Sequence, residues 1–206
     1  MKNHDKKRRA ILGISGASGS IYALRLAKFL LEAGAQVYCI PSRPAKKILS
    51  DETGFDSFET AIEAQLEEKS LLENLKMCDI DDFYAPPASG SFGFGAMCIL
   101  PCSMNTLGKI AGSIADNLLV RAAEVALKER RKLVVCPRES PLTLSHIENM
   151  KTLFLSGAET VRRLSAIPWA AAQLQYTVMS AILSATPCVT AIFLSKNARA
   201  QEREFI

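Results

Sequence analysis

Short, continuous apolar runs alternate along the chain with longer segments that are polar on one face. Four runs, at residues 10–14, 36–40, 97–100 and 132–136, predict strands buried in a parallel sheet. Helices are predicted at residues 21–33, 58–75, 105–112, 117–130 and 144–155. Strands separated by helices predict an α/β fold, a doubly wound parallel sheet in a single domain.

Charge and composition exclude several classes of protein. The net charge of +4 lies in the first ten residues, and the other 196 are neutral overall, so we expect residues 1–9 to be a solvated basic tail and no binding to nucleic acid. Six cysteines, mostly in apolar runs, and only two histidines favour reduced thiols over disulfides or a metal site. Residues 164–195 are uncharged, but proline and glutamine interrupt them, and they fall short of the ~20 mainly apolar residues of a membrane span. We therefore expect a cytoplasmic protein.

Polar loops follow three of the predicted strands. They leave the carboxyl ends of these strands, which is where ligands bind in an open parallel sheet. Residues 15–20 are rich in glycine and serine and precede a helix whose free N–H groups suit an anion, although a plain tight turn explains them equally well. Residues 101–106 gather Ser103, Asn105 and Thr106, whose hydroxyl and amide groups suit a phosphate or the polar edge of a flavin ring. A helix N-cap at Ser103 is the alternative, and it accounts for one of the three.

The third loop, residues 137–141, places Arg138 and Glu139 between two prolines. Arg138 suits a phosphate or a flavin carbonyl and Glu139 suits proton transfer, with a surface ion pair as the alternative. Together the three loops predict an anionic, aromatic ligand such as FMN. Ser42, after the second strand, and Glu52, ten residues later, fit the same site.

Several motifs, in order, resemble those of the flavin prenyltransferase family. The resemblance covers about residues 10–159, which we take as the FMN-binding domain. It rests on residues 13–22, 51–53, 85–91, 101–107, 117–123, 127–131, 137–141 and 146–150. It implies a Rossmann-like flavoprotein fold and a homo-oligomer, expected to be a dodecamer, with FMN between subunits and no metal.

The resemblance also implies a reaction. Members of the family join the dimethylallyl group of dimethylallyl phosphate to N5 and C6 of reduced FMN. The product, prenylated FMN, serves a partner decarboxylase in ubiquinone biosynthesis or aromatic acid decarboxylation.

Roles follow from the matched positions. The FMN-binding residues implied are Gly16, Ala17, Ser18, Ser42, Ser103, Met104, Asn105, Thr106 and Arg138. The resemblance gives Arg121 and Lys128 to the substrate phosphate, and Ser18, Glu52 and Glu139 to catalysis. It makes Ser89, Gly90 and Ser91 part of a lid. Without the resemblance, Arg121 and Lys128 read as a solvated helix face, with Glu124 and Lys128 paired one turn apart.

The chain departs from the family after Glu159. Residues 160–206 form an atypical tail that lacks the family's Phe-Tyr pair and the arginine of its final helix, which complete the phosphate site. We therefore expect an intact FMN site and impaired prenyl transfer. Two alternatives stay open: a flavin-dependent cysteine decarboxylase of the same superfamily, and a non-catalytic FMN-binding subunit.

Overall fold

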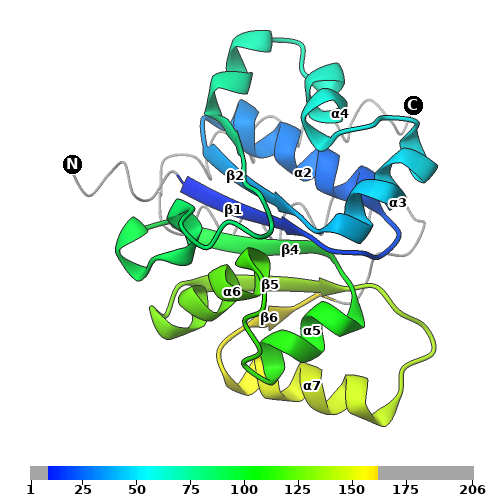
Figure 1. The fold of residues 1–206 in the computed structure, drawn as a ribbon, viewed down its shortest axis with the longest axis vertical. Coiled ribbons are helices and arrows are strands. Elements are labelled where there is room, and N and C mark those ends of the chain that lie inside the picture. The colour runs from blue at the N-terminus through cyan, green and yellow to red at the C-terminus, as the bar shows by residue number, and fades with distance from the viewer. Residues whose placement is uncertain (1–8, 162–206) are drawn as a thin grey trace, which may run out of the picture.

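A computed structural model describes residues 9–161 of the chain. Six parallel strands form one sheet in the order β3-β2-β1-β4-β5-β6 (Figure 1). The strands are β1 (Arg9–Ile14), β2 (Gln36–Pro41), β3 (Leu75–Met77), β4 (Ala96–Cys102), β5 (Lys132–Pro137) and β6 (Glu159–Thr160). This is the strand order of Rossmann sheets. All strands are parallel, but successive strands are added on one side of β1 up to β3 and on its other side from β4 onwards. The predicted doubly wound, single-domain α/β fold is confirmed.

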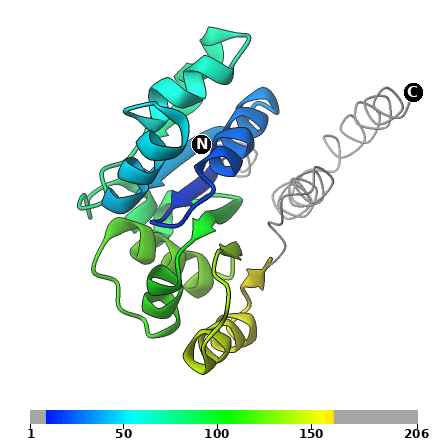
Figure 2. The ribbon, with the colours of Figure 1, turned by 90° about the vertical axis from the view of Figure 1, so that its right-hand side faces the viewer.

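Helices cover both faces of the sheet (Figure 2). They are α2 (Ser20–Glu32), α3 (Arg43–Thr53), α4 (Phe58–Gln65), α5 (Met104–Ala111), α6 (Leu118–Lys128) and α7 (Leu144–Leu155). Helices α2, α3 and α4 pack on one face, and α5, α6 and α7 on the other. In the part of the chain that the structure describes, no helix has the length and apolar character that crossing a membrane requires.

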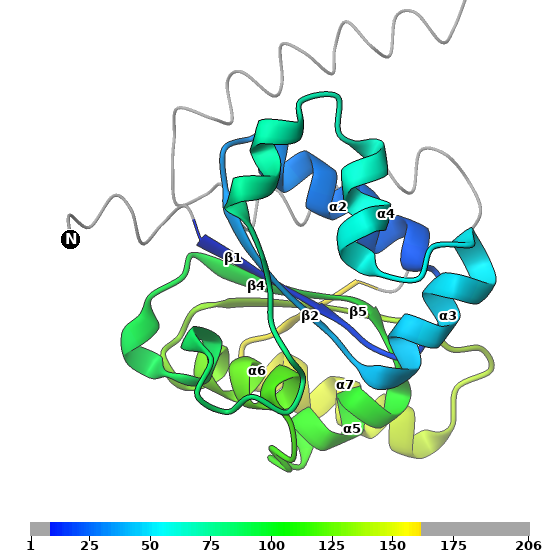
Figure 3. The same ribbon diagram turned by 45° about the horizontal axis from the view of Figure 1, so that its top comes forward.

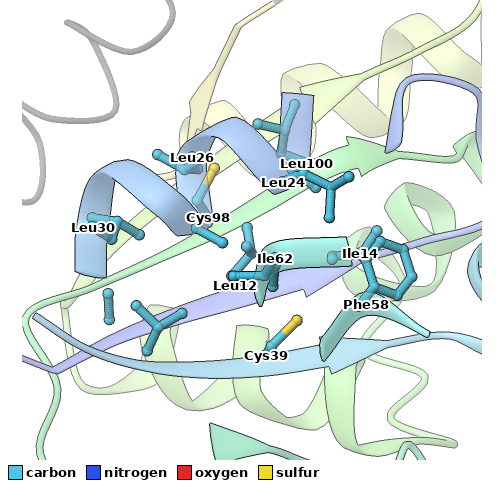
Figure 4. Packing of buried hydrophobic residues seen from close by; sticks show 14 of the residues in the cluster. Leu12, Ile14, Leu24, Leu26, Leu30, Cys39, Phe58, Ile62, Cys98 and Leu100 are labelled. Carbon is cyan, nitrogen blue, oxygen red and sulfur yellow. The ribbon is translucent and has the colours of Figure 1, made fainter. Parts of the chain in front are cut away.

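Each central strand buries both of its faces, as its continuous apolar run predicts. Leu12 and Ile14 of β1 lie in the cluster that contains Leu24 of α2 and Phe58 of α4 (Figure 4). Ile11, between them in sequence, joins the opposite cluster under α5, α6 and α7. Side chains alternate across a strand, so neighbouring residues of this one short strand contact both helical layers.

The predicted helix at residues 58–75 is wrong in its second half. Helix α4 ends at Gln65, a 3-10 turn occupies Lys69–Asn74, and β3 follows. The segment is rich in good helix formers, but Leu66 and Leu75 are buried in the core and the chain must reach the sheet beside β2. Tertiary packing therefore overrides the local preference.

Helix α6 runs from one end of the sheet to the other. Its N-cap, Asn117, lies in the groove described below, and its last turn leads directly into the start of β5. Eleven residues of helix extend about 16 Å. Residues 88–94 lie near the amino ends of the strands, since Gly95 N–H donates to Arg9 O at the start of β1 (Figure 3).

Candidate active site

A groove lies at the carboxyl ends of the strands. One cavity of about 610 Å³ and a second of about 420 Å³ share Gly16, Ser103, Met104 and Glu139, so we treat them as one, the strand-end groove. The other lining residues are Ala17, Ser18, Ser42, Arg43, Pro44, Ile80, Asp81, Asn105, Thr106, Lys109, Asp116, Asn117, Arg138, Ser140 and His146. Its size is in the range of pockets for small organic ligands.

The loops around the groove are joined by hydrogen bonds. Ser15 is buried, and its hydroxyl donates to Pro101 O at 3.1 Å and accepts from Ser103 N–H at 2.6 Å. Arg138 N–H donates to Cys102 O at 2.9 Å, which holds the third loop to the second. The three predicted ligand loops therefore form one connected edge.

The floor of the groove requires a glycine. A Cβ on Gly16 would lie 2.6 Å from Cβ of Pro44, closer than two carbons can approach. Ala17 and Ser18 follow along the groove, and Ser18 is exposed with no side-chain hydrogen bond inside residues 9–161. The first loop thus offers backbone and a free hydroxyl to a ligand.

Two serines that cap helices also line the groove. Ser103 caps α5 by accepting from Thr106 N–H at 3.3 Å, and it also donates to Thr106 Oγ1 at 3.1 Å. Ser42 caps α3 in the same way, accepting from Ala45 N–H at 3.3 Å. The capping interpretation of Ser103 is correct, yet Ser103, Ser42 and the neighbouring Asn105 also line the groove.

Glu52 lies at the N-terminus of α2. Its two carboxylate oxygens accept from Gly19 N–H and Ser20 N–H, each at 2.8 Å. The helix N-terminus, expected to be free for an anion, thus already holds a carboxylate, which its positive end stabilises. Glu52 does not line the strand-end groove.

Arg138 and Glu139 both face the groove and are exposed. Within the described range they form no ion pair, so the surface-pair alternative is not observed. Glu139 Oε1 accepts from Ser140 N–H at 3.1 Å, and the Arg138 guanidinium has no side-chain partner among residues 9–161. Arg138 is therefore available to an anion.

Arg121 and Lys128 lie elsewhere. Arg121 Nε donates to Ala88 O at 3.2 Å, and its guanidinium lies 3.6 Å from Glu124. Lys128 Nζ lies 3.1 Å from Glu129 Oε1, so the expected pair of Glu124 with Lys128 does not form. These two cations and the predicted lid residues Ser89, Gly90 and Ser91 are outside the groove lining. In one copy of the chain, neither cation lines the groove that the predicted FMN-binding residues form.

Sequence reasoning missed two ion pairs and a histidine in the groove. Arg43 pairs with Asp81 and Lys109 with Asp116, each at 2.5 Å. The hydrogen bond from Lys109 lowers the pKa of Asp116 below its ordinary value. His146 lines the groove while its Nδ1 accepts from Thr143 N–H at 3.3 Å. Its place in the motif at residues 146–150 was the available signal.

The donor set of the groove fits FMN. Hydroxyl and amide groups suit a phosphate and the carbonyl edge of a flavin, and an unpaired arginine suits either. The close approach at Gly16 lets backbone contact the ligand. Across residues 9–161, no group of three or more His, Cys, Asp or Glu side chains is arranged to hold a metal ion.

Comparisons with known proteins agree with this donor set. The model of the family described as Flavoprotein matches residues 1–182. The flavin prenyltransferase UbiX of Archaeoglobus fulgidus is 43% identical over 150 residues, which are 73% of this chain and 77% of the relative.

Two solved structures are similar over most of the chain. A crystal structure of AnUbiX in complex with FMN and dimethylallyl pyrophosphate has a TM-score of 0.73 at 28% identity, covering 85% of this chain and 92% of the other. A dodecameric FMN-dependent UbiX-like decarboxylase from Escherichia coli O157:H7 has a TM-score of 0.69 at 31% identity, covering 85% and 93%.

Proposed function

The chain belongs to the flavoprotein family and, within it, to the flavin prenyltransferases, and we propose that the strand-end groove is where it binds FMN for that reaction. The enzyme joins the dimethylallyl group of dimethylallyl phosphate to N5 and C6 of reduced FMN. Reduced FMN supplies the electron-rich ring that accepts the group. The observation that carries the proposal is the connected edge of three loops, with Gly16, Ser103 and Arg138 facing one groove.

We assign the FMN contacts to groove residues. The backbone at Gly16 and Ala17 approaches the ligand, and the hydroxyls of Ser18, Ser42, Ser103 and Thr106 form hydrogen bonds with it. The Asn105 amide and the Arg138 guanidinium bind its polar groups, while Met104 supplies an apolar contact.

The substrate phosphate requires cations, and Arg121 and Lys128 are the matched ones. Lys128 lies at the end of α6 far from the groove, and Arg121, one turn after the N-cap Asn117, points its guanidinium to Ala88 and Glu124 and does not line the groove. We therefore propose that both cations serve the groove of a neighbouring copy in a homo-oligomer. The dodecamer described for the UbiX-like decarboxylase is the assembly we propose for this chain. In such an interface, residues 89–91 of one copy cover the groove of another.

Cations on a departing phosphate lower the barrier to breaking the allylic C–O bond, because they stabilise the charge that develops there. We propose that Glu139, which faces the groove, moves the proton that leaves the ring. Ser18, which lines the groove, acts beside the flavin, and Glu52 supports the reaction by holding the loop of Gly19 and Ser20 next to it. The product is passed to a prenylated-FMN-dependent decarboxylase, and we place the enzyme in the cytoplasm.

The test is to incubate the protein anaerobically with reduced FMN and dimethylallyl phosphate and to weigh the flavin by mass spectrometry. Flavin heavier by one C5H8 unit supports prenyl transfer, and a reaction lacking the phosphate ester is the control. Unchanged flavin, together with tight FMN binding, would favour the non-catalytic subunit. Release of CO2 from a pantothenoyl cysteine would instead favour the cysteine decarboxylase.

A further inference from the structure

Residues 88–94, which we call the arginine-held loop, are fixed to the body of the protein. Arg131 donates from Nη2 to Gly90 O at 2.5 Å, and its guanidinium lies 4.5 Å from the centre of the Phe94 ring. Arg9 donates to Phe92 O at 3.2 Å and lies 5.1 Å from the centre of that ring. Each arginine combines a hydrogen bond with a cation–π contact, so the loop has a defined position.

The Glu129 side chain lies against Gly90 of this loop. A Cβ on Gly90 would lie 2.6 Å from Glu129 Oε1 and 3.2 Å from its Cδ, so a larger residue at position 90 would displace the carboxylate. The same oxygen lies 3.1 Å from Lys128 Nζ. The missing side chain at Gly90 therefore leaves the space that the Glu129 carboxylate occupies, within ion-pair distance of the Lys128 ammonium.

Arg131 is the anchor of this arrangement. Its Nη1 is buried and has no hydrogen-bond partner in the described part of the chain. A buried donor without a partner is unfavourable, so the hydrogen bond from Nη2 to Gly90 O and the contact with the Phe94 ring keep Arg131 in place despite that cost. Arg121 is tied to the same loop through Ala88 O.

We propose that Glu129 is a positioning residue, which the arginine-held loop fixes so that it orients Lys128 toward the substrate phosphate. The inference rests on the proposed function of Arg121 and Lys128. Lysine has a long, flexible stem, and a side chain held in one geometry loses less conformational entropy when it binds an anion. The Glu129 carboxylate also repels a phosphate placed beside it. If its main role is to orient Lys128, removing its charge weakens phosphate binding, and if repulsion dominates, removing the charge strengthens it.

The experiment measures binding of inorganic phosphate to the FMN-loaded protein by isothermal titration calorimetry. We expect Glu129→Gln to weaken phosphate binding about two- to fivefold, the range of a partly exposed ion pair, and Glu129→Asp to restore part of it. The matched control is Glu148→Gln, which removes an exposed helix carboxylate that pairs with Lys151 at 3.2 Å. FMN affinity should stay unchanged in all three variants.

A second variant tests the contact with Gly90. Gly90→Ala displaces the carboxylate, so it should weaken phosphate binding in the same direction. The double variant with Glu129→Gln should be no weaker than the more affected single variant, because both act on one contact. Additive losses would mean that Gly90 acts on the fold instead.

The outcomes separate this inference from the function on which it rests. Phosphate binding that depends on Lys128 but is unchanged or tighter in Glu129→Gln overturns the positioning role and leaves the proposed phosphate site standing. Phosphate binding that is the same in wild type and Lys128→Ala overturns both.

Discussion

Ser15 and Ser103, 88 residues apart in sequence, are joined by a 2.6 Å hydrogen bond from the backbone of Ser103 to the hydroxyl of Ser15. This bond links the loop after β1 to the loop after β4, the two sides of the point where the sheet reverses its winding. Ligands of open α/β sheets bind at this point, so the bond fixes the width of the site at its centre.

Replacing Ser15 with alanine should destabilise the protein. The change leaves the Ser103 N–H without its partner in a part-buried position, which costs about 1–3 kcal/mol. Thermal unfolding and FMN titration should both report it, as a lower Tm and weaker binding. Ser50→Ala, on the exposed side of α3, is the control and should change neither. An unchanged Tm in Ser15→Ala would contradict the stabilising role of this hydrogen bond.

Arg138→Ala should weaken FMN binding about 10- to 100-fold, the value of one charge-assisted hydrogen bond. Flavin fluorescence titration measures it directly. Arg25→Ala, on the exposed face of α2, serves as the control for loss of one positive charge. Titration curves that coincide for Arg138→Ala and wild type would remove Arg138 from the site.

Glu139→Gln should bind FMN normally but form prenylated flavin about 10²–10⁴-fold more slowly, as expected for loss of a general acid or base. The amide keeps the acceptor for Ser140 N–H, so the loop geometry is preserved. Single-turnover rates followed by absorbance would show the loss. Equal rates in variant and wild type would leave Glu139 with only its hydrogen bond to the loop.

The tail supplies a fourth prediction, although residues 162–206 lie outside the described part of the chain. The missing tyrosine and arginine would each remove a charge-assisted hydrogen bond to phosphate, so productive substrate binding should fall about 10²–10⁴-fold. FMN affinity should be near normal, and a family-like tail grafted after Glu159 should raise prenyl transfer. Prenyl transfer by the native chain that the graft does not increase would refute it.

Cysteine reactivity gives a fifth prediction. Burial, with Asp82 nearby, raises the pKa of the Cys78 thiol to about 11, whereas Cys39, Cys98, Cys102 and Cys136 are fully buried. The thiolate is the reactive form, so labelling of Cys78 by an aromatic disulfide should accelerate about tenfold per pH unit from 7 to 10. In a Cys188→Ser background, one thiol should react before unfolding. Labelling of two or more would contradict the burial.

The sequence was informative where burial is continuous. The apolar runs identified β1, β2, β4 and β5 because strands covered on both faces need no polar positions. Helix α3 was missed because only Ala45 and Leu49 of its eleven residues are buried, too few to form an apolar stripe. Its N-cap Ser42, early proline and following Gly54 were the usable signals.

Strands β3 and β6 were missed for another reason. They have three and two residues, and no periodicity develops over such lengths. The predictability of the site residues also depended on how local their sequence signals are. Residue chemistry pointed to Ser103, Asn105 and Arg138 because they follow strands directly, while the ion pairs of Arg43 and Lys109 depend on partners distant in sequence.

The orientation of α6 has a consequence for how two different mutant chains affect one another in a mixed oligomer. Its amino end borders the groove of its own chain, and its carboxyl end carries Lys128 at the opposite end of the sheet. In the proposed assembly, each chain supplies the groove of its own site and contributes Lys128 to the site of a neighbour. A chain damaged in its groove remains a competent donor of Lys128, and one damaged at Lys128 keeps a competent groove. We therefore expect two such alleles, each inactive alone, to complement one another when expressed together.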